Sequence, residues 1–296
     1  MPPFQNLPDL SMTTTRTVKT SLGHQMTVFS PDHVGDKIAT QGLYEKENLA
    51  LLLALLQRVP GAVALDIGAN IGNHTLALAT TAAEVHAFEP MPHVHQVLAE
   101  NVASNDLGGK VTVHHCALSD SAGSDTIYIR LDGNYGASSF DKRSEQVEAV
   151  TVHKHVGDTY LNEVGVSRVD FVKMDVEAHE VFVLRGLRNM LERDRPIITM
   201  EWNDPLTIER LQNSPELAFL QQHYSIFVLG SSYDRGYWAG RPFGLLRRKW
   251  LKFTQPRHAV LYYFDASQLY KNLLLIPKGR ESLLEGLEPI QFPPRA

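Results

Sequence analysis

Short apolar runs alternate with amphipathic stretches along the chain from Val63 onward. The runs have the length of β-strands, and the stretches between them have helical periodicity. Such alternation is typical of an α/β protein whose parallel sheet is covered by helices on both faces. The strands that we expect are Val63–Ile67, Glu84–Phe88, Val111–Ala117, Val169–Met174, Ile197–Glu201 and Ser225–Leu229.

Other segments add to this framework. Thr126–Arg130 predicts an extra strand or hairpin arm, and Asn272–Ile276 predicts a late strand that inserts antiparallel at an edge. The helical pattern covers Val94–Asn101 and Glu180–Leu191, while residues 36–58 predict one or two further helices. No internal repeat interrupts the pattern, so one α/β domain is the simplest organisation.

The expected domain covers residues 36–277 and carries a basic and aromatic insertion at 231–260. Residues 1–35 are expected to form an N-terminal arm and a lead-in segment, and residues 278–296 a C-terminal tail. The first 20 residues are rich in Pro, Thr and Ser, which predicts a loose arm.

Composition is that of an ordinary globular protein, with 43% hydrophobic and 21% charged residues among 296. A net charge of -5 argues against general nucleic-acid binding. The single cysteine, Cys116, fits a reducing compartment and is interpreted as a small buried hydrophobe. The start of the chain has no secretory signal pattern, and the most apolar run, Leu49–Leu56, is too short to span a bilayer. We therefore expect a cytoplasmic protein.

The most informative segment is the expected strand Val63–Ile67 and the glycine loop that follows it. Gly68 and Gly72 have the spacing G-x-x-x-G, which differs from the G-x-G-x-x-G of pyrophosphate-binding dinucleotide sites. Such a loop brings backbone N–H groups and the positive end of the next helix close to a ligand. Asp66, just before the loop, would repel a pyrophosphate and favours a ligand with a cationic group, such as the ammonium of S-adenosylmethionine.

A second carboxylate supports a nucleoside ligand. Glu89 ends the next expected strand, 23 residues beyond Asp66, and is followed by Pro90. A carboxylate at this place in α/β nucleotide sites binds ribose hydroxyls.

A third polar cluster follows the expected strand that ends at Met174. Asp175 stands at the carboxyl end of this strand, where open α/β sheets bind ligands. Glu177, His179 and Glu180 fall in the first turn of the next helix, where acids also serve as ordinary helix caps. His179 is a candidate general base, and a helix-surface histidine is the competing interpretation.

Several of these motifs in register resemble the FkbM family of S-adenosylmethionine-dependent methyltransferases. The segments that carry the resemblance are Asp66–Thr75, Glu89-Pro90, Ala117–Asp120, Gly136–Ser139 and Lys173–Glu180, with Gly42–Glu45 and Asn272–Pro277 as flanking motifs. The resemblance implies a class I methyltransferase fold, which is a Rossmann-like three-layer sandwich. Its mostly parallel seven-stranded sheet has an antiparallel last strand. One departure is Ala178, where the family usually has glycine.

The resemblance also implies a set of cofactor-binding residues. The loop should lie near the methionine part of the cofactor, Glu89 at the ribose, the segment from Ala117 at the adenine, and Asp175 on the methyl-transfer side. The full expected set is Glu45, Asp66, Gly68, Ala69, Asn70, Gly72, Asn73, Glu89, Pro90, Ala117, Leu118 and Asp175.

The acceptor side is less sharply defined. Trp202 and Asn203 leave the fifth expected strand and could line an acceptor pocket. The 231–260 segment carries seven Lys or Arg residues against one acid, together with several aromatic residues. It could close over the pocket as a lid, with Arg247 and Arg248 gripping an anionic acceptor, or rest on an anionic membrane surface. A solvated basic loop is the competing interpretation.

The function that we expect is transfer of a methyl group to a hydroxyl of a sugar, a glycolipid or polysaccharide precursor or a small natural product. His179, Glu177 or Asp175 would act as the base. The alternatives are a non-catalytic cofactor-binding protein that docks a partner, and an N-methyltransferase. The 13 histidines show no metal-ligand spacing, so no metal is expected.

Overall fold

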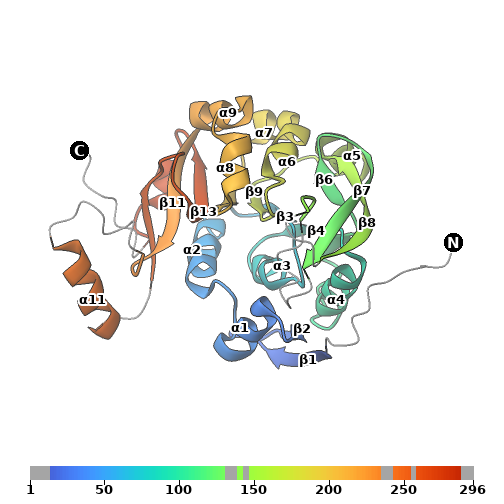
Figure 1. Ribbon diagram of the computed structural model, residues 1–296, viewed down its shortest axis with the longest axis horizontal. Coiled ribbons are helices and arrows are strands. Elements are labelled where there is room, and N and C mark those ends of the chain that lie inside the picture. Colours follow the sequence, from blue (N-terminus) through green and yellow to red (C-terminus); the bar gives the residue numbers. More distant parts are fainter. Residues whose placement is uncertain (1–13, 131–138, 143–146, 235–242, 255–257, 288–296) are drawn as a thin grey trace.

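The computed structural model describes residues 14–130, 139–142, 147–234, 243–254 and 258–287 (Figure 1). At its centre lies an eight-stranded sheet with the order β12-β11-β13-β10-β9-β3-β4-β5. Its strands are β3 (Val63–Ile67), β4 (Glu84–Phe88), β5 (Val111–His114), β9 (Phe171–Met174), β10 (Ile197–Trp202), β11 (Tyr224–Ser231), β12 (Ala259–Tyr263) and β13 (Tyr270–Pro277).

The direction of the strands confirms the class I methyltransferase fold. The strands β10, β9, β3, β4 and β5 pair in parallel, and β13 inserts antiparallel between β10 and β11. The eighth strand, β12, was not expected. It comes from the 231–260 insertion and the residues just after it, and it extends the sheet beyond β11.

Helices cover both faces of this sheet. One face packs against α2 (Lys46–Leu56), α3 (Asn73–Ala79) and α4 (Pro92–Ala103). The other packs against α5 (Gly157–Glu163), α6 (Glu180–Gly186), α7 (Arg188–Asp194), α8 (Pro205–Leu211) and α9 (Pro215–His223). Alternate residues of β3 enter the two cores, because side chains of a strand point to opposite faces: Ala64 joins one and Leu65 the other.

Two expected elements are divided in the structure. The expected strand Val111–Ala117 ends at His114 in β5, and Ala117 begins β6 (Ala117–Ser119) in a separate sheet. This sheet has the order β6-β8-β7 and contains β7 (Gly123–Arg130) and β8 (Val147–Val156). The expected helix over Glu180–Leu191 becomes α6 and α7, which are separated at Leu187. The end of α6 lies tightly against β6, since a Cβ on Gly186 would lie 1.9 Å from the carbonyl oxygen of Ser119.

The N-terminal segment is more ordered than a loose arm. β1 (Thr14–Lys19) and β2 (Gln25–Ser30) form an antiparallel hairpin, followed by α1 (His33–Gln41). The hairpin is fastened to α4 by Asn101, whose side chain accepts from the amide of Thr27 at 2.6 Å and donates to its carbonyl at 3.0 Å. The expectation of a loose arm is therefore wrong for residues 14–19, and its first 13 residues lie outside the described part.

The described part of the insertion also contains α11 (Gly244–Thr254). The last described turn, η2 (Glu281–Leu284), is held by Arg58, which donates to the carbonyls of Leu283 and Glu285. Among the described residues, no helix combines the length and the apolar character needed to cross a bilayer.

Candidate functional site

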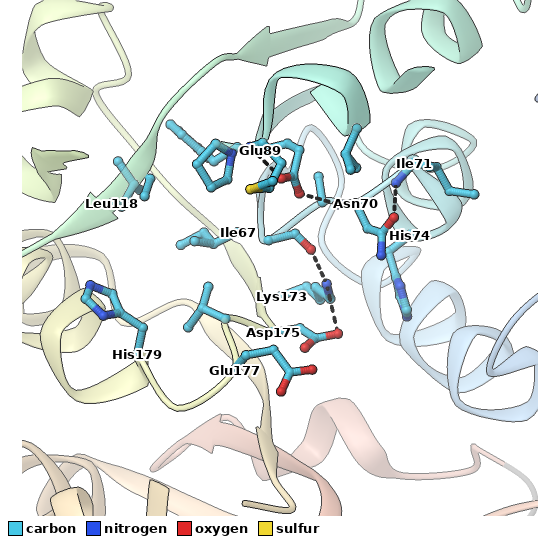
Figure 2. Close-up of a pocket in the computed structure, with 18 of the residues that line it drawn as sticks. Ile67, Asn70, Ile71, His74, Glu89, Leu118, Lys173, Asp175, Glu177 and His179 are labelled. Carbon is cyan, nitrogen blue, oxygen red and sulfur yellow. Dashed lines mark hydrogen bonds and ion pairs between the residues drawn. The ribbon is translucent and has the colours of Figure 1, made fainter. Parts of the chain in front are cut away.

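A pocket opens at the carboxyl ends of β3, β4 and β9 (Figure 2). The space inside it is about 950 Å³ when the part open to solvent is counted. The loop after β3, the end of β4, the start of β6 and the turn after β9 all contribute to its wall. The structure thus brings together segments that lie far apart in the sequence and that were expected to form one site.

The loop after β3 is clamped between the two neighbouring strands. The amides of Gly68 and Ala69 both donate to the carbonyl of Phe88 at the end of β4. On the other side, a Cβ on Gly68 would lie 1.9 Å from the carbonyl oxygen of Asp175, and Gly68 has a φ of +76°. Gly68 is therefore required by contact with the chain after β9, whereas the sequence suggested contact with the ligand.

Asp66 lies below this loop and does not line the pocket. Its carboxylate is fully buried, accepts a hydrogen bond from Thr75 Oγ1 at 2.6 Å and lies 3.4 Å from Lys173 Nζ. Lys173 also donates to the carbonyl of Gly68 at 2.9 Å. The expectation that Asp66 faces a cationic ligand is therefore wrong. The negative charge of Asp66 is paired with Lys173 inside the protein, and Lys173 in turn holds the loop through the carbonyl of Gly68.

Glu89 lies at the tip of β4 with its carboxylate facing the pocket (Figure 2). Its two oxygens accept hydrogen bonds from the amides of Asn70 and Met91, both at 2.9 Å. Burial raises the pKa of Glu89 to about 7, although both amides favour the charged form. Each oxygen keeps a further lone pair, so the carboxylate can still accept hydrogen bonds from a ligand.

The N-terminus of α3 forms the adjoining wall. Gly72 caps the helix with a φ of +96°. The side chain of Asn73 exchanges two hydrogen bonds with the backbone of Tyr44, at 3.0 and 3.1 Å, and both residues line the pocket. Pro90 lines the wall beside Glu89, and Asn70 has a φ of +51° and uses its side chain to accept from the amide of Ile71.

Glu45 lies one layer behind the pocket, in a smaller cavity that shares Asp175 and His74 with it. Its carboxylate lies 2.7 Å from Lys271 Nζ and accepts from Asn272 at 2.9 Å. Burial alone would raise the pKa of Glu45, but His74 and Lys271 hold it well below its ordinary range. The structure therefore gives Glu45 a supporting role and not a place in the pocket wall.

The opposite end of the pocket is apolar. Ala117 and Leu118 of β6 line it together with Ile127, Phe140 and Cys116. Burial raises the pKa of the Cys116 thiol to about 11, so the thiol stays neutral, as expected for a small hydrophobe. Such a surface suits a flat heterocycle. Of the motif Gly136–Ser139, only Ser139 lies within the described residues; it donates to the carbonyl of Glu177.

Three carboxylates gather where β9 and β10 end. The parallel register pairs Thr199 with Lys173, so Glu201 and Asp175, two residues further along, fall beside each other on the same face. Oxygens of Asp175, Glu177 and Glu201 lie within 4.8 Å of one another. Burial, with repulsion from Asp175 and Glu177, raises the pKa of Glu201 well above its ordinary value. The group can hold a proton or a divalent cation.

His179 faces the apolar end of the pocket, away from the carboxylates of Asp175 and Glu177 (Figure 2). Its Nε2 lies 3.0 Å from Ser119 Oγ, and its ring lies between Phe140 and Phe182, with centroid distances of 4.4 and 4.7 Å. Burial, together with Lys154 and Arg210, lowers the pKa of His179 to about 4. The imidazole is therefore neutral and a weak base, which argues against the catalytic role considered for it.

The residues expected on the acceptor side lie elsewhere. Trp202 is fully buried in the core and packs edge-on against Phe264, at 5.1 Å between ring centroids. Asn203 is exposed and donates to Glu201 at 3.0 Å. Arg247 and Arg248 belong to α11, and no described residue of the 231–260 insertion lines the pocket. The lid over the pocket is therefore not found in the described part of the chain.

Sequence reasoning gave too little weight to four residues of the site. Lys173 was noticed only as sharing a strand face with Asp175, although it holds the loop. Glu201 was expected to face the same crevice as Asp175 and Glu177 but was given no role, although it completes the carboxylate group. Tyr44 lies beside Glu45 in a motif that was noted, and Phe140 lies in a segment without a clear pattern. The signal that brings Glu201 to this group is its place at the carboxyl end of a parallel strand, because such ends meet at one edge of the sheet.

Comparison with known proteins identifies the family. The family model described as the methyltransferase FkbM domain matches residues 66–227, just over half of the chain. The chain is 33% identical over 155 residues to the hexuronic acid methyltransferase AglP of Haloferax volcanii. This match covers 52% of the present chain and 62% of AglP. It is 29% identical over 160 residues to the 31-O-demethyl-FK506 methyltransferase FkbM of Streptomyces tacrolimicus, covering 44% of this chain and 61% of that protein. The matches thus span about three fifths of the length of each relative.

Among solved structures, the chain is similar to methyltransferase FkbM from Methylobacillus flagellatus. The TM-score is 0.41 with 16% sequence identity, and the match covers 73% of this chain and 44% of that one.

Proposed function

This chain belongs to the FkbM family of methyltransferases, whose methyl donor is S-adenosylmethionine, and we propose that it methylates a hydroxyl oxygen of a sugar or another small natural product. The observation that carries the proposal is one pocket with Glu89 on one side and the carboxylates of Asp175 and Glu177 on another. The first side suits a nucleoside cofactor, and the second suits removal of a proton from an acceptor.

The pocket fits the cofactor, which supplies a methyl group on a positively charged sulfur. Glu89 would accept hydrogen bonds from the ribose hydroxyls with the lone pairs that Asn70 and Met91 leave available. Ala117 and Leu118 would flank the adenine, and the N-terminus of α3 would lie near the methionine carboxylate. The carboxylates after β9 would favour the positive charge of the sulfur.

The chain's own residues would then position the acceptor and take its proton. Glu201 does not itself line the pocket, but one of its carboxylate oxygens lies within 4.8 Å of oxygens of Asp175 and Glu177, which do. It is the base that we propose, because burial and its two acidic neighbours make it a stronger base than an ordinary glutamate. Asp175 and Glu177 line the pocket and would orient the hydroxyl. Proton removal by a positioned base increases the rate of such reactions by ~10²–10⁴-fold. Alignment of the reacting atoms supplies much of the remaining rate enhancement.

Two relatives support an oxygen acceptor. The name of AglP describes a hexuronic acid as its acceptor, and the name of the Streptomyces relative describes 31-O-demethyl-FK506. The acidic rim of the present pocket adds a constraint, because the carboxylates of Asp175 and Glu177 would repel an anionic group beside the reacting hydroxyl. We therefore propose an acceptor that presents a neutral, hydroxyl-bearing face to this rim.

Mass spectrometry with a deuterated-methyl cofactor tests the proposal. The protein would be incubated with neutral oligosaccharides, hexuronic acid oligosaccharides, hydroxylated polyketides and amine-bearing analogues of each. The proposal predicts a labelled methyl group on a hydroxyl compound, and no label with Glu89→Ala. Label found only on the amine analogues would overturn it.

A further inference from the structure

The helix α11 lies at the outer edge of the molecule, beyond β11 and on the side away from the pocket (Figure 1). It contacts the remainder of the described protein through basic side chains. Arg248 Nε donates to the carbonyl of Tyr233, and Lys252 Nζ lies 5.7 Å from the centre of the Tyr233 ring. These two residues are four apart and therefore mark one face of the helix, which is the face turned toward Tyr233.

The opposite face is apolar and exposed. Leu246 and Trp250 are also four residues apart, and a rotation of ~100° per residue places them across the helix axis from Arg248 and Lys252. Their exposed fractions are 66% and 61%, and Phe243, just before the helix, is 77% exposed. Arg248 and Lys252 thus face the protein while Leu246 and Trp250 face outward, where an ordinary surface helix places polar residues.

The charges on α11 indicate what covers the apolar face. Arg247 and Lys249 are exposed and flank it on its two sides. No acidic residue occurs between Phe243 and Thr254, so no carboxylate in the helix neutralises its four positive charges. A tryptophan and a leucine between basic side chains are typical of helices that lie in the interface of an anionic bilayer.

We infer that α11 docks this protein on an anionic membrane surface. Leu246 and Trp250 enter the boundary between headgroups and acyl chains, and Arg247 and Lys249 contact the phosphates with their aliphatic stems buried. The helix has 11 residues, so it lies in the plane of the membrane and does not cross it. Binding leaves the pocket open, because no described residue of α11 lines it.

Vesicle co-sedimentation of the full chain tests this inference. Vesicles of phosphatidylcholine with ~30% phosphatidylglycerol are compared with vesicles of phosphatidylcholine alone, at low and high salt. We expect binding to the anionic vesicles only, and weaker binding at high salt. The double variant Leu246→Ser with Trp250→Ser should lose binding, while Arg247→Glu with Lys249→Glu should weaken it by at least about tenfold.

Matched variants on other exposed positions serve as controls. Leu269→Ser removes an exposed leucine outside α11, and Lys19→Glu with Lys46→Glu reverses two exposed charges elsewhere. Both controls should bind vesicles as the unmodified chain does, and all variants should keep its melting temperature and its affinity for S-adenosylhomocysteine. Absence of vesicle binding would overturn the inference. Self-association through α11 without vesicle binding would also overturn it and identify a second copy as the partner.

Discussion

The ammonium of Lys173 lies 3.4 Å from the carboxylate of Asp66, inside the sheet and directly below the loop that borders the pocket. Burial alone would lower the pKa of Lys173, but the carboxylates of Asp66, Asp175 and Glu201 raise it above its ordinary value. The lysine therefore stays charged, and its bond to the carbonyl of Gly68 fixes the loop to β9. The geometry of the pocket therefore depends on this buried ion pair.

Replacing Lys173 with methionine should destabilise the protein by about 3–5 kcal/mol, because Asp66 would be left as a buried, unpaired charge. Chemical denaturation measures this loss. The control is Lys154→Met, which breaks the more exposed pair with Asp125 and should cost about 1 kcal/mol or less. The double variant Asp66→Asn with Lys173→Met should be less destabilised than the sum of the two single variants. A loss below about 1 kcal/mol for Lys173→Met would contradict the role assigned to the pair.

Gly68→Ala should be far more damaging than Gly61→Ala. Both glycines have a positive φ, +76° and +72°, but only at Gly68 would a Cβ meet the backbone, at 1.9 Å from the carbonyl of Asp175. Gly61→Ala should cost about 1–2 kcal/mol from the left-handed conformation alone. Gly68→Ala should cost more and should also lower the affinity for S-adenosylhomocysteine. Equal thermal stability of the two variants would show that the loop can move away from β9.

The sequence predicted the parts of this molecule that local patterns determine. The ranges of β3 and β4, the glycine loop and Glu89 lie where expected, because a strand, a turn and a terminal acid leave a local signature. Contacts between distant segments were not predictable in this way. Asp66 was assigned to a ligand since nothing near it in the sequence shows that Lys173 neutralises it. Trp202 was assigned to the pocket because the face of a strand on which a residue falls depends on register.

Glu89→Gln should weaken the binding of S-adenosylhomocysteine by about 1.5–3 kcal/mol, the usual worth of hydrogen bonds to a charged group. The substitution preserves size but removes the charge that would accept the ribose hydroxyls. Titration calorimetry measures the affinity, and Glu84→Gln, at the exposed start of the same strand, is the control. Unchanged affinity in Glu89→Gln would remove this residue from the cofactor site.

The affinity for S-adenosylhomocysteine should fall as the pH is lowered through about 7. Burial raises the pKa of Glu89 to about 7 in the free protein, and the protonated carboxyl is a poorer acceptor for hydroxyl groups. Below that pH, each unit should reduce affinity by up to about tenfold, and the Glu89→Gln variant should lose this dependence. The raised pKa has the opposite effect on folding. Between pH 4.5, the unperturbed pKa of a glutamate, and about pH 7, Glu89 loses its proton in the unfolded chain but keeps it in the folded protein, so the stability of the fold decreases as the pH rises through this range. Calorimetry across pH 5.5–8.5 checks the first effect, and a flat profile would contradict it.

Glu201→Gln should lower kcat by about 10²–10⁴-fold and leave the affinity for the cofactor unchanged, because it removes the proposed base without touching the Glu89 side of the pocket. His179→Ala should lower kcat only a few-fold, since the pKa of its imidazole is already lowered to about 4. Steady-state kinetics with the acceptor found by mass spectrometry compares the kcat values of the two variants with that of the unmodified chain. The control is Glu209→Gln, an exposed glutamate on α8. A larger loss in His179→Ala than in Glu201→Gln would reverse the two roles.

The most direct test of the account is to determine the atom that receives the methyl group. The protein is incubated with carbon-13 methyl-labelled S-adenosylmethionine and its acceptor, and the product is examined by nuclear magnetic resonance. The account predicts a labelled methyl signal that correlates through bonds with a carbon bearing oxygen, and loss of that signal in Glu201→Gln. A labelled methyl group on nitrogen, or full transfer by Glu201→Gln, would contradict it.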